Sequence, residues 1–194
     1  MKAAVKGRAK EAAGSLAGLL VILKVSPMFL TGLGLVLSTA AGVAFWRGEF
    51  LAAGILMLFG GLCDMLDGAV ARRSNTASSF GAFIDSSLDR YAEAAVFIGI
   101  LLHSFAAGSQ VQVFLALLAL TGSFMVSYTR ARAEGLGLEC AVGLMERPER
   151  FLVLIVGALL GPRWMPYAIG VLAVTANLTA LQRMFHVRRM TRRR

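Results

Sequence analysis

Residues 50–71 read FLAAGILMLFGGLCDMLDGAVA, an apolar stretch in which the only charged side chains are Asp64 and Asp67. A helix needs about 20 mostly apolar residues to cross the hydrocarbon core of a bilayer, and this stretch reaches that length. Acidic side chains inside a membrane span are costly to insert and are therefore functional-site candidates. The stretch predicts a transmembrane helix that carries part of a functional site.

The sequence on both sides of this stretch contains further apolar segments. The fifth segment is the weakest, because its uninterrupted apolar part covers only residues 151–160. The sequence therefore predicts an all-α integral membrane fold with six transmembrane helices in a single domain over residues 1–194. We expect the six spans at residues 25–46, 50–71, 80–105, 111–128, 148–161 and 164–181.

The composition supports a membrane protein and excludes several other classes. Of the 194 residues, 57% are hydrophobic and only 16% are charged, with a mean hydropathy of +0.70. Soluble domains carry about 25% charged residues, so a soluble enzyme and a disordered chain are both disfavoured. The net charge of +9 suggests contact with an anionic membrane surface. The basic residues stand at the ends of apolar runs, so no nucleic-acid partner is expected. The two cysteines indicate no disulfide framework.

The N-terminal residues 1–24 form a separate region. The uncharged run between Glu11 and Lys24 is too short to span a membrane, and it lacks the small-residue cleavage pattern of a signal peptide. We expect an amphipathic juxtamembrane helix on the membrane surface. The six-helix bundle would then cover residues 25–188, followed by a basic tail at 189–194.

The distribution of basic residues predicts the orientation. Only Arg47 and Arg163 fall in turns on one side of the six-span arrangement, and the other 18 of the 20 basic residues lie toward the opposite side. Cytoplasmic loops carry the excess of Lys and Arg. We therefore expect a multi-pass protein of the cell (inner) membrane, with both termini and the active site on the cytoplasmic side.

Acidic residues gather in one part of the sequence. Five of the eleven lie within residues 64–93. Asp64 and Asp67 are three residues apart, and Asp85 and Asp89 are four apart, so each pair lies on one face of its helix. Two antiparallel helices joined by a short cytoplasmic turn would bring these four carboxylates together.

Four neighbouring carboxylates repel one another unless cations lie between them. Hard divalent cations such as Mg²⁺ or Mn²⁺ prefer oxygen ligands, and two such ions can clamp a phosphoryl group. The alternative is a set of structural salt bridges to Arg72, Arg73 and Arg90. Such pairing would not require a glycine one turn from the first acid of each pair, as Gly68 and Gly81 are.

The pattern Asp64-x2-Asp67-Gly68-x2-Ala71-Arg72-x8-Gly81-x3-Asp85-x3-Asp89 resembles the signature of the CDP-alcohol phosphotransferases at every defining position. The resemblance implies a six-helix membrane bundle preceded by a surface helix, two Mg²⁺ or Mn²⁺ ions and a homodimer. It also implies a reaction, in which an acceptor hydroxyl attacks the diphosphate of a CDP-linked lipid and CMP leaves. The donor would be CDP-diacylglycerol or an ether analogue.

The resemblance also implies roles for single residues. All four aspartates would bind metal, and Asp89 would in addition act as the base on the acceptor hydroxyl. Contacts to the CDP-lipid would come from Thr31, Gly68, Arg72 and Ser78.

The acceptor is suggested by two strings, SYTRARAE at residues 127–134 and ERPER at 146–150, and by Arg183. Guanidinium groups match phosphate oxygens, although arginines at span ends can also simply snorkel to the interface. The strings resemble the subgroup that makes phosphatidylinositol phosphate or archaetidylinositol phosphate from inositol phosphate. The implied acceptor-phosphate ligands are Ser127, Arg130, Arg150 and Arg183, with Arg147 as a competitor for the role of Arg150.

Three other interpretations stay open at this stage. Glycerol 3-phosphate would also need a phosphate site and is the second candidate acceptor. An intramembrane prenyltransferase binds Mg²⁺ through aspartates, but it would need two separated motifs and usually more spans. A non-enzymatic membrane module would use buried acids as an ion path and would release no CMP.

Overall fold

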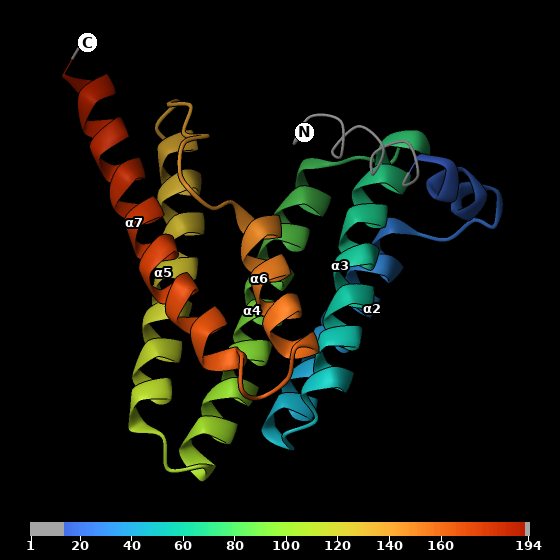
Figure 1. Cartoon of the computed structure of the whole chain (residues 1–194). Helices are drawn as coiled ribbons and strands as arrows, with labels where there is room; N and C mark the ends of the chain where they lie inside the picture. The colour runs from blue at the N-terminus through green and yellow to red at the C-terminus, as the bar shows by residue number, and fades with distance from the viewer. Residues whose placement is uncertain (1–13, 193–194) are drawn as a thin grey trace.

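The structure is a computed structural model that describes residues 14–192. Within this range the chain is entirely helical apart from turns and loops, and it contains no strand. A short helical segment covers residues 14–22, and six longer helices follow (Figure 1). These are α2 (Pro27–Trp46), α3 (Phe50–Arg73), α4 (Ser79–Ala106), α5 (Gln110–Glu134), α6 (Arg147–Leu159) and α7 (Met165–Thr191).

Local sequence signals account for several helix ends. The N-H of Phe29 donates to Ser26 Oγ at 3.2 Å at the start of α2, and the N-H of Gly81 donates to Ser78 Oγ at 3.0 Å at the start of α4. These serines satisfy N-H groups that have no partner within the helix. A tight turn separates α2 from α3, where Gly48 adopts φ +80°, a conformation that glycine reaches without strain.

Two helices continue beyond their expected ends. α5 runs to Glu134 rather than 128, and α7 runs to Thr191 rather than 181. The added turn of α5 contains a 2.8 Å ion pair between Arg130 and Glu134, four residues apart, which stabilises a helix. Part of the predicted charged loop is therefore helical.

The helices pack in groups that can be followed in Figure 1. α2 packs along α3 and α4, and α5 packs along α7 on the opposite side of the molecule. α6 contacts both α3 and α7, so it connects the two groups. Because successive helices alternate in direction, the start of α4, the end of α3 and the start of α6 lie toward the same end of the bundle. This arrangement brings the charged ends of several helices together.

The crossing of α2 and α4 depends on two glycines. A Cβ atom at Gly42 would overlap the carbonyl oxygen of Ala95, and one at Gly99 would overlap the carbonyl oxygen of Gly42. The two backbones therefore approach each other more closely than side chains would allow. Small residues at helix crossings are characteristic of membrane bundles.

Gly42→Ala is expected to destabilise the protein by about 1–3 kcal/mol, because the added methyl group forces the two backbones apart. Gly32→Ala in the same helix is the matched control, since nothing lies within 4 Å of a Cβ there. Thermal unfolding of the purified protein in detergent measures both changes. Equal unfolding temperatures for the two variants would contradict the close packing of α2 on α4.

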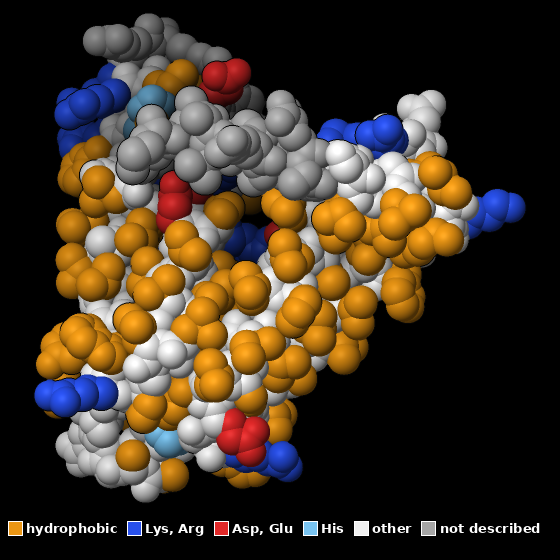
Figure 2. All heavy atoms as spheres, turned by 45° about the vertical axis from the view of Figure 1, so that its right-hand side comes forward, with side chains coloured by type: hydrophobic (Ala, Val, Ile, Leu, Met, Phe, Trp, Pro, Cys, Tyr) orange, Lys and Arg blue, Asp and Glu red, His pale blue; other side chains and the backbone are white. Residues whose placement is uncertain are grey.

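Four helices are long and apolar enough to cross a membrane, namely α2, α3, α5 and α7, within the part of the chain that is described. α4 has the length, but its apolar sequence is interrupted by Asp85, Asp89, Arg90 and Glu93. α6 has only 13 residues, a rise of about 20 Å. Figure 2 shows hydrophobic side chains covering the middle of one face, with charged side chains toward both ends and inside a hollow.

The segment before α2 packs against the ends of α2 and α3. Ala17 forms a small apolar cluster with Leu30 and Val70, and Arg73 Nη1 donates to the carbonyl of Gly14 at 3.1 Å. Most of the expected juxtamembrane helix, residues 1–13, lies outside the described residues, as do residues 193–194 of the basic tail.

Candidate active site

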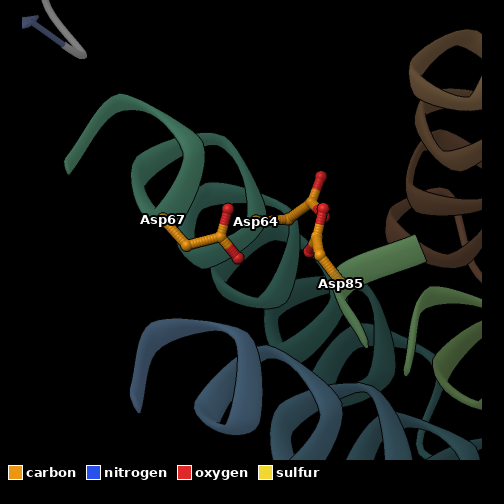
Figure 3. Close-up of side chains that lie close together, drawn as sticks. All are labelled: Asp64, Asp67 and Asp85. Atoms are coloured by element: carbon orange, nitrogen blue, oxygen red, sulfur yellow. The ribbon is translucent and has the colours of Figure 1, made fainter. Parts of the chain in front are cut away.

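Three aspartates from two helices form a carboxylate group. Asp64 and Asp67 on α3 and Asp85 on α4 each offer an oxygen atom, and these atoms all lie within 4.8 Å of one another. Figure 3 shows the three carboxylates lying close together. The oxygen Oδ1 of Asp85 is buried and has no hydrogen-bond partner among the described residues. Three converging carboxylates with a free buried oxygen fit a hard divalent cation.

The fourth predicted ligand, Asp89, lies outside this group. Its Oδ1 is 2.5 Å from Arg147 Nη2, and its Oδ2 is 3.7 Å from Arg90 Nη2. The other side of the Arg147 guanidinium binds Asp64, with Nη1 2.8 Å from Oδ1. Asp64 therefore belongs both to the carboxylate group and to an ion pair with α6.

The alternative in which the acids pair with Arg72, Arg73 and Arg90 agrees with the structure only in part. Arg90 contacts Asp89, as that alternative required. In residues 14–192, however, neither Arg72 nor Arg73 forms an ion pair with any of the aspartates. The arginine that does so most closely is Arg147, which lies 83 positions after Asp64.

A largely apolar cavity of about 350 Å³ opens beside the carboxylates between α2, α3, α4 and α6. Leucine, methionine, phenylalanine, isoleucine, alanine, proline and glycine residues form most of its wall, and the polar groups are confined to a few positions. This lining suits a ligand with an apolar part and a charged head. The polar lining includes Thr31, Ser38, Asp64, Asp67, Asp89 and Arg147.

The four predicted CDP-lipid contacts are placed differently from one another. Thr31 lines the cavity, and its hydroxyl donates to Asp67 Oδ2 at 2.9 Å. Gly68 leaves room for the side chain of Arg72, whose Nη1 would lie 3.2 Å from a Cβ at that position. Ser78 caps α4. Gly68, Arg72 and Ser78 do not line this cavity, so their contacts to a nucleotide stay a prediction.

A second cavity, of about 820 Å³, lies between α4, α5, α6 and α7. Arginines dominate its charged lining, which suits an anionic ligand. All five predicted acceptor residues contribute to its wall, although they come from three different helices. The charged and hydroxyl residues that line it are Ser86, Arg90, Ser127, Tyr128, Arg130, Glu134, Glu146, Arg147, Arg150 and Arg183.

Several of these arginines also bind groups of the protein. Arg183 is buried and donates to the carbonyls of Val142, at 2.8 Å, and Val126, at 2.6 Å. Arg183 therefore ties α7 to the end of α5 and to the following loop. Arg130 is half exposed and pairs with Glu134. Ser127 accepts a hydrogen bond from Arg90.

One arginine in the wall of the second cavity, Arg150, belongs to a buried ion pair. Arg150 on α6 and Glu93 on α4 are each 1% exposed, and Arg150 Nη2 lies 3.3 Å from Glu93 Oε1. Arg90 Nη1 lies 3.5 Å from the other Glu93 oxygen. The atoms Nε and Nη1 of Arg150 have no partner among residues 14–192. An anion in the cavity would satisfy these buried donors.

Arg90 was not predicted as a site residue, although it contacts Asp89, Glu93 and Ser127. Its position inside an otherwise apolar segment, next to a candidate aspartate, was the available signal. The sequence indicates Arg90 only as a salt-bridge partner, because its position in the sequence does not reveal that it faces α5.

Comparison with known proteins is consistent with this geometry. The chain is 42% identical over 163 residues to the archaetidylinositol phosphate synthase of Methanothermobacter thermautotrophicus, covering 82% of this chain and 81% of that protein. It superposes on the crystal structure of Mycobacterium tuberculosis phosphatidylinositol phosphate synthase with CDP-DAG bound, with a TM-score of 0.82 and 33% identity over 90% of this chain and 92% of that one.

The same mycobacterial enzyme in complex with manganese and citrate matches with a TM-score of 0.81 at 33% identity, covering 90% of this chain and 88% of that one. The family model for CDP-alcohol phosphatidyltransferases matches residues 24–182, which include all four aspartates, the lining of the first cavity and the lining of the second cavity except Arg183. The chain is thus a member of the CDP-alcohol phosphatidyltransferase family.

Proposed function

We propose that this protein transfers a phosphatidyl-type group from a CDP-linked lipid to a hydroxyl of inositol phosphate, with release of CMP, in phospholipid biosynthesis. The observation that carries the proposal is an apolar cavity lined by three of the aspartates, which shares Arg147 with a second cavity lined by arginines. A lipid donor and an anionic acceptor would meet there. The relatives named for inositol phosphate products support this acceptor.

The donor would be CDP-diacylglycerol or an ether-linked analogue, with its apolar chains in the first cavity. Asp64, Asp67 and Asp85 would hold Mg²⁺ or Mn²⁺, and we propose two ions, with Asp89 as a further ligand. Bound metal supplies positive charge that stabilises the negative charge developing on the phosphoryl oxygens. Manganese in the mycobacterial relative supports this choice of metal.

The proposed reaction forms one bond and breaks another. The acceptor hydroxyl oxygen bonds to the lipid-linked phosphorus, the bond from that phosphorus to CMP breaks, and the hydroxyl proton passes to Asp89. A base must lie within hydrogen-bond reach of this hydroxyl. Asp89 lines the first cavity, and the adjacent Arg90 lines the second, so Asp89 stands close to the boundary between them.

The phosphate of the acceptor would bind in the second cavity. Arg150 offers two buried donors with no partner in the described residues, and Ser127, Arg130 and Arg183 contribute to the same wall. Contacts to phosphate from several guanidinium groups would hold the acceptor in a fixed orientation.

We further propose that all six long helices cross the cell membrane, with α4 and α6 included. The segment before α2 would lie on the membrane surface as an amphipathic helix, and both termini and the two cavities would face the cytoplasm. The family resemblance suggests a homodimer.

The proposal predicts CMP release from CDP-diacylglycerol by the purified protein with Mg²⁺ when inositol phosphate is the acceptor. Glycerol 3-phosphate, free inositol and serine serve as comparisons, and an ether-linked donor is tested in parallel. Release with glycerol 3-phosphate instead would keep the aspartate mechanism and overturn the assigned acceptor. No release with any donor and acceptor would contradict the proposed function.

A further inference from the structure

Arg147 occupies an unexpected position for a residue that would bind the acceptor. It is the first residue of α6, and its guanidinium lies between Asp64 on α3, at 2.8 Å, and Asp89 on α4, at 2.5 Å. The side chain thus joins three helices at the reaction centre.

The start of α6 holds this arginine in place. Glu146 and Glu149 form a reciprocal capping box, in which the N-H of Glu146 donates to Glu149 Oε2 at 2.6 Å. The guanidinium also lies over the ring of Phe151, 5.6 Å from its centroid. The capping box stabilises the first turn of the helix, whereas the contact with Phe151 is made by the side chain of Arg147 itself.

The position of Arg147 conflicts with the proposed chemistry. The guanidinium binds Oδ1 of Asp64 and Oδ1 of Asp89, so these two oxygens are less available to a cation and to the proton of a hydroxyl. A guanidinium and a divalent cation therefore compete for the same carboxylates. Displacement of Arg147 from them would favour transfer.

The side chain of Arg147 could move from the carboxylates toward the second cavity. Arg147 lines both cavities, and its neighbours in the second one include Arg90 and Arg150. An anion bound by these residues attracts a third guanidinium, because phosphate oxygens accept several charge-assisted hydrogen bonds. The acceptor phosphate and the aspartates would thus compete for the guanidinium of Arg147.

We propose that Arg147 couples acceptor binding to activation of Asp89. With the second cavity empty of acceptor, Arg147 covers Asp64 and Asp89, and acceptor phosphate draws it away. This inference rests on the proposed function and deepens it, since a covered Asp89 would not promote hydrolysis of the donor. In that side reaction water bonds to the lipid-linked phosphorus, the bond to CMP breaks, and Asp89 takes the proton from water, giving phosphatidic acid and CMP.

The first test is Arg147→Gln, with Arg189→Gln as a control that removes an exposed arginine near the end of α7. CMP release from CDP-diacylglycerol without acceptor is expected to rise about tenfold in Arg147→Gln, in line with typical coupling between sites. Arg147→Lys, which keeps the positive charge but loses the guanidinium fork that pairs with two carboxylates, is expected to raise acceptor-free release less than Arg147→Gln does. Unchanged acceptor-free release in Arg147→Gln, together with a raised KM for inositol phosphate, would make Arg147 only a phosphate ligand and overturn the coupling.

The second test does not depend on turnover. Binding of Mn²⁺ to the purified protein, followed by electron paramagnetic resonance, is expected to be about tenfold tighter in Arg147→Gln, because a competing cation has been removed. Inositol phosphate is expected to tighten Mn²⁺ binding to the wild-type protein and to have a smaller effect on Arg147→Gln. Equal effects on both proteins would overturn the coupling.

These measurements distinguish a failure of the proposed function from a failure of the proposed coupling. If the wild-type protein released no CMP with any acceptor, the proposed function would fail, while Mn²⁺ binding would still decide whether Arg147 competes with a cation. If CMP release depended on inositol phosphate but the wild type and Arg147→Gln bound Mn²⁺ with equal affinity, the proposed function would stand and the coupling would fail.

Discussion

Asp89→Asn is expected to lower the rate of CMP release by about a hundredfold to ten-thousandfold, the usual contribution of a general base. Asparagine has nearly the same shape as aspartate, but it cannot accept the proton of the acceptor hydroxyl. Asp89 is also well placed for this role, since it lines the first cavity and adjoins Arg90 in the wall of the second.

The proposed base and the other proposed metal ligands occupy different positions. Asp64, Asp67 and Asp85 form the close carboxylate group, and Asp89 lies outside it. Mn²⁺ affinity is therefore expected to fall more in Asp85→Asn than in Asp89→Asn. Turnover by CMP release and Mn²⁺ binding, measured on the same preparations, compare the two variants.

Glu49→Gln provides the control, because Glu49 is an exposed acid at the other end of α3. It is expected to behave as the wild type in both assays. Wild-type turnover in Asp89→Asn would place the base elsewhere. An equal loss of Mn²⁺ binding in Asp89→Asn and Asp85→Asn would make Asp89 primarily a metal ligand.

Glu93→Ala is expected to destabilise the protein by about 3–5 kcal/mol, because it leaves the guanidinium of Arg150 buried without its counter-charge. Both residues are 1% exposed, so the unpaired guanidinium would stay largely shielded from bulk water. Arg90 loses a partner as well. Thermal unfolding in detergent measures the loss, and Glu139→Ala, which removes an exposed acid in the loop after α5, serves as the control.

A double variant tests whether this effect comes from the unpaired charge. Glu93→Leu with Arg150→Met replaces the pair by apolar side chains of similar size, and such replacements of buried pairs are often neutral or stabilising. The double variant is therefore expected to unfold near the wild-type temperature. The KM of the double variant for inositol phosphate is expected to lie above the wild-type value, because Arg150 is absent. If the double variant were as unstable as Glu93→Ala, packing rather than charge would explain the loss.

Much of the fold was predictable because membrane helices are encoded by local composition. The apolar runs located all six long helices, and the ends that were missed lie in α5 and α7, where charged residues continue a helix beyond the apolar segment. Thr129 illustrates the reason, since its hydroxyl bonds the carbonyl of Met125 one turn earlier. Composition alone marks such a residue as part of a loop.

The carboxylate group was predictable for a different reason. The spacing of Asp64 from Asp67 fixes a shared helix face, and the short connection to α4 brings Asp85 near. The position of Arg147 could not be predicted in this way. Nothing in the string ERPER shows which arginine faces α3 and which is buried against Glu93, because that choice depends on how α6 packs between α3 and α7.

The shared wall at Arg147 has a consequence for inhibition. Because one side chain borders both cavities, a single molecule that joins a nucleotide-lipid portion to a phosphorylated polyol could fill both. Linking two ligands makes the second binding event intramolecular and raises its effective concentration. Such a bisubstrate compound would bind more tightly than either half, provided that its linker passes between α4 and α6 where Arg147 now lies.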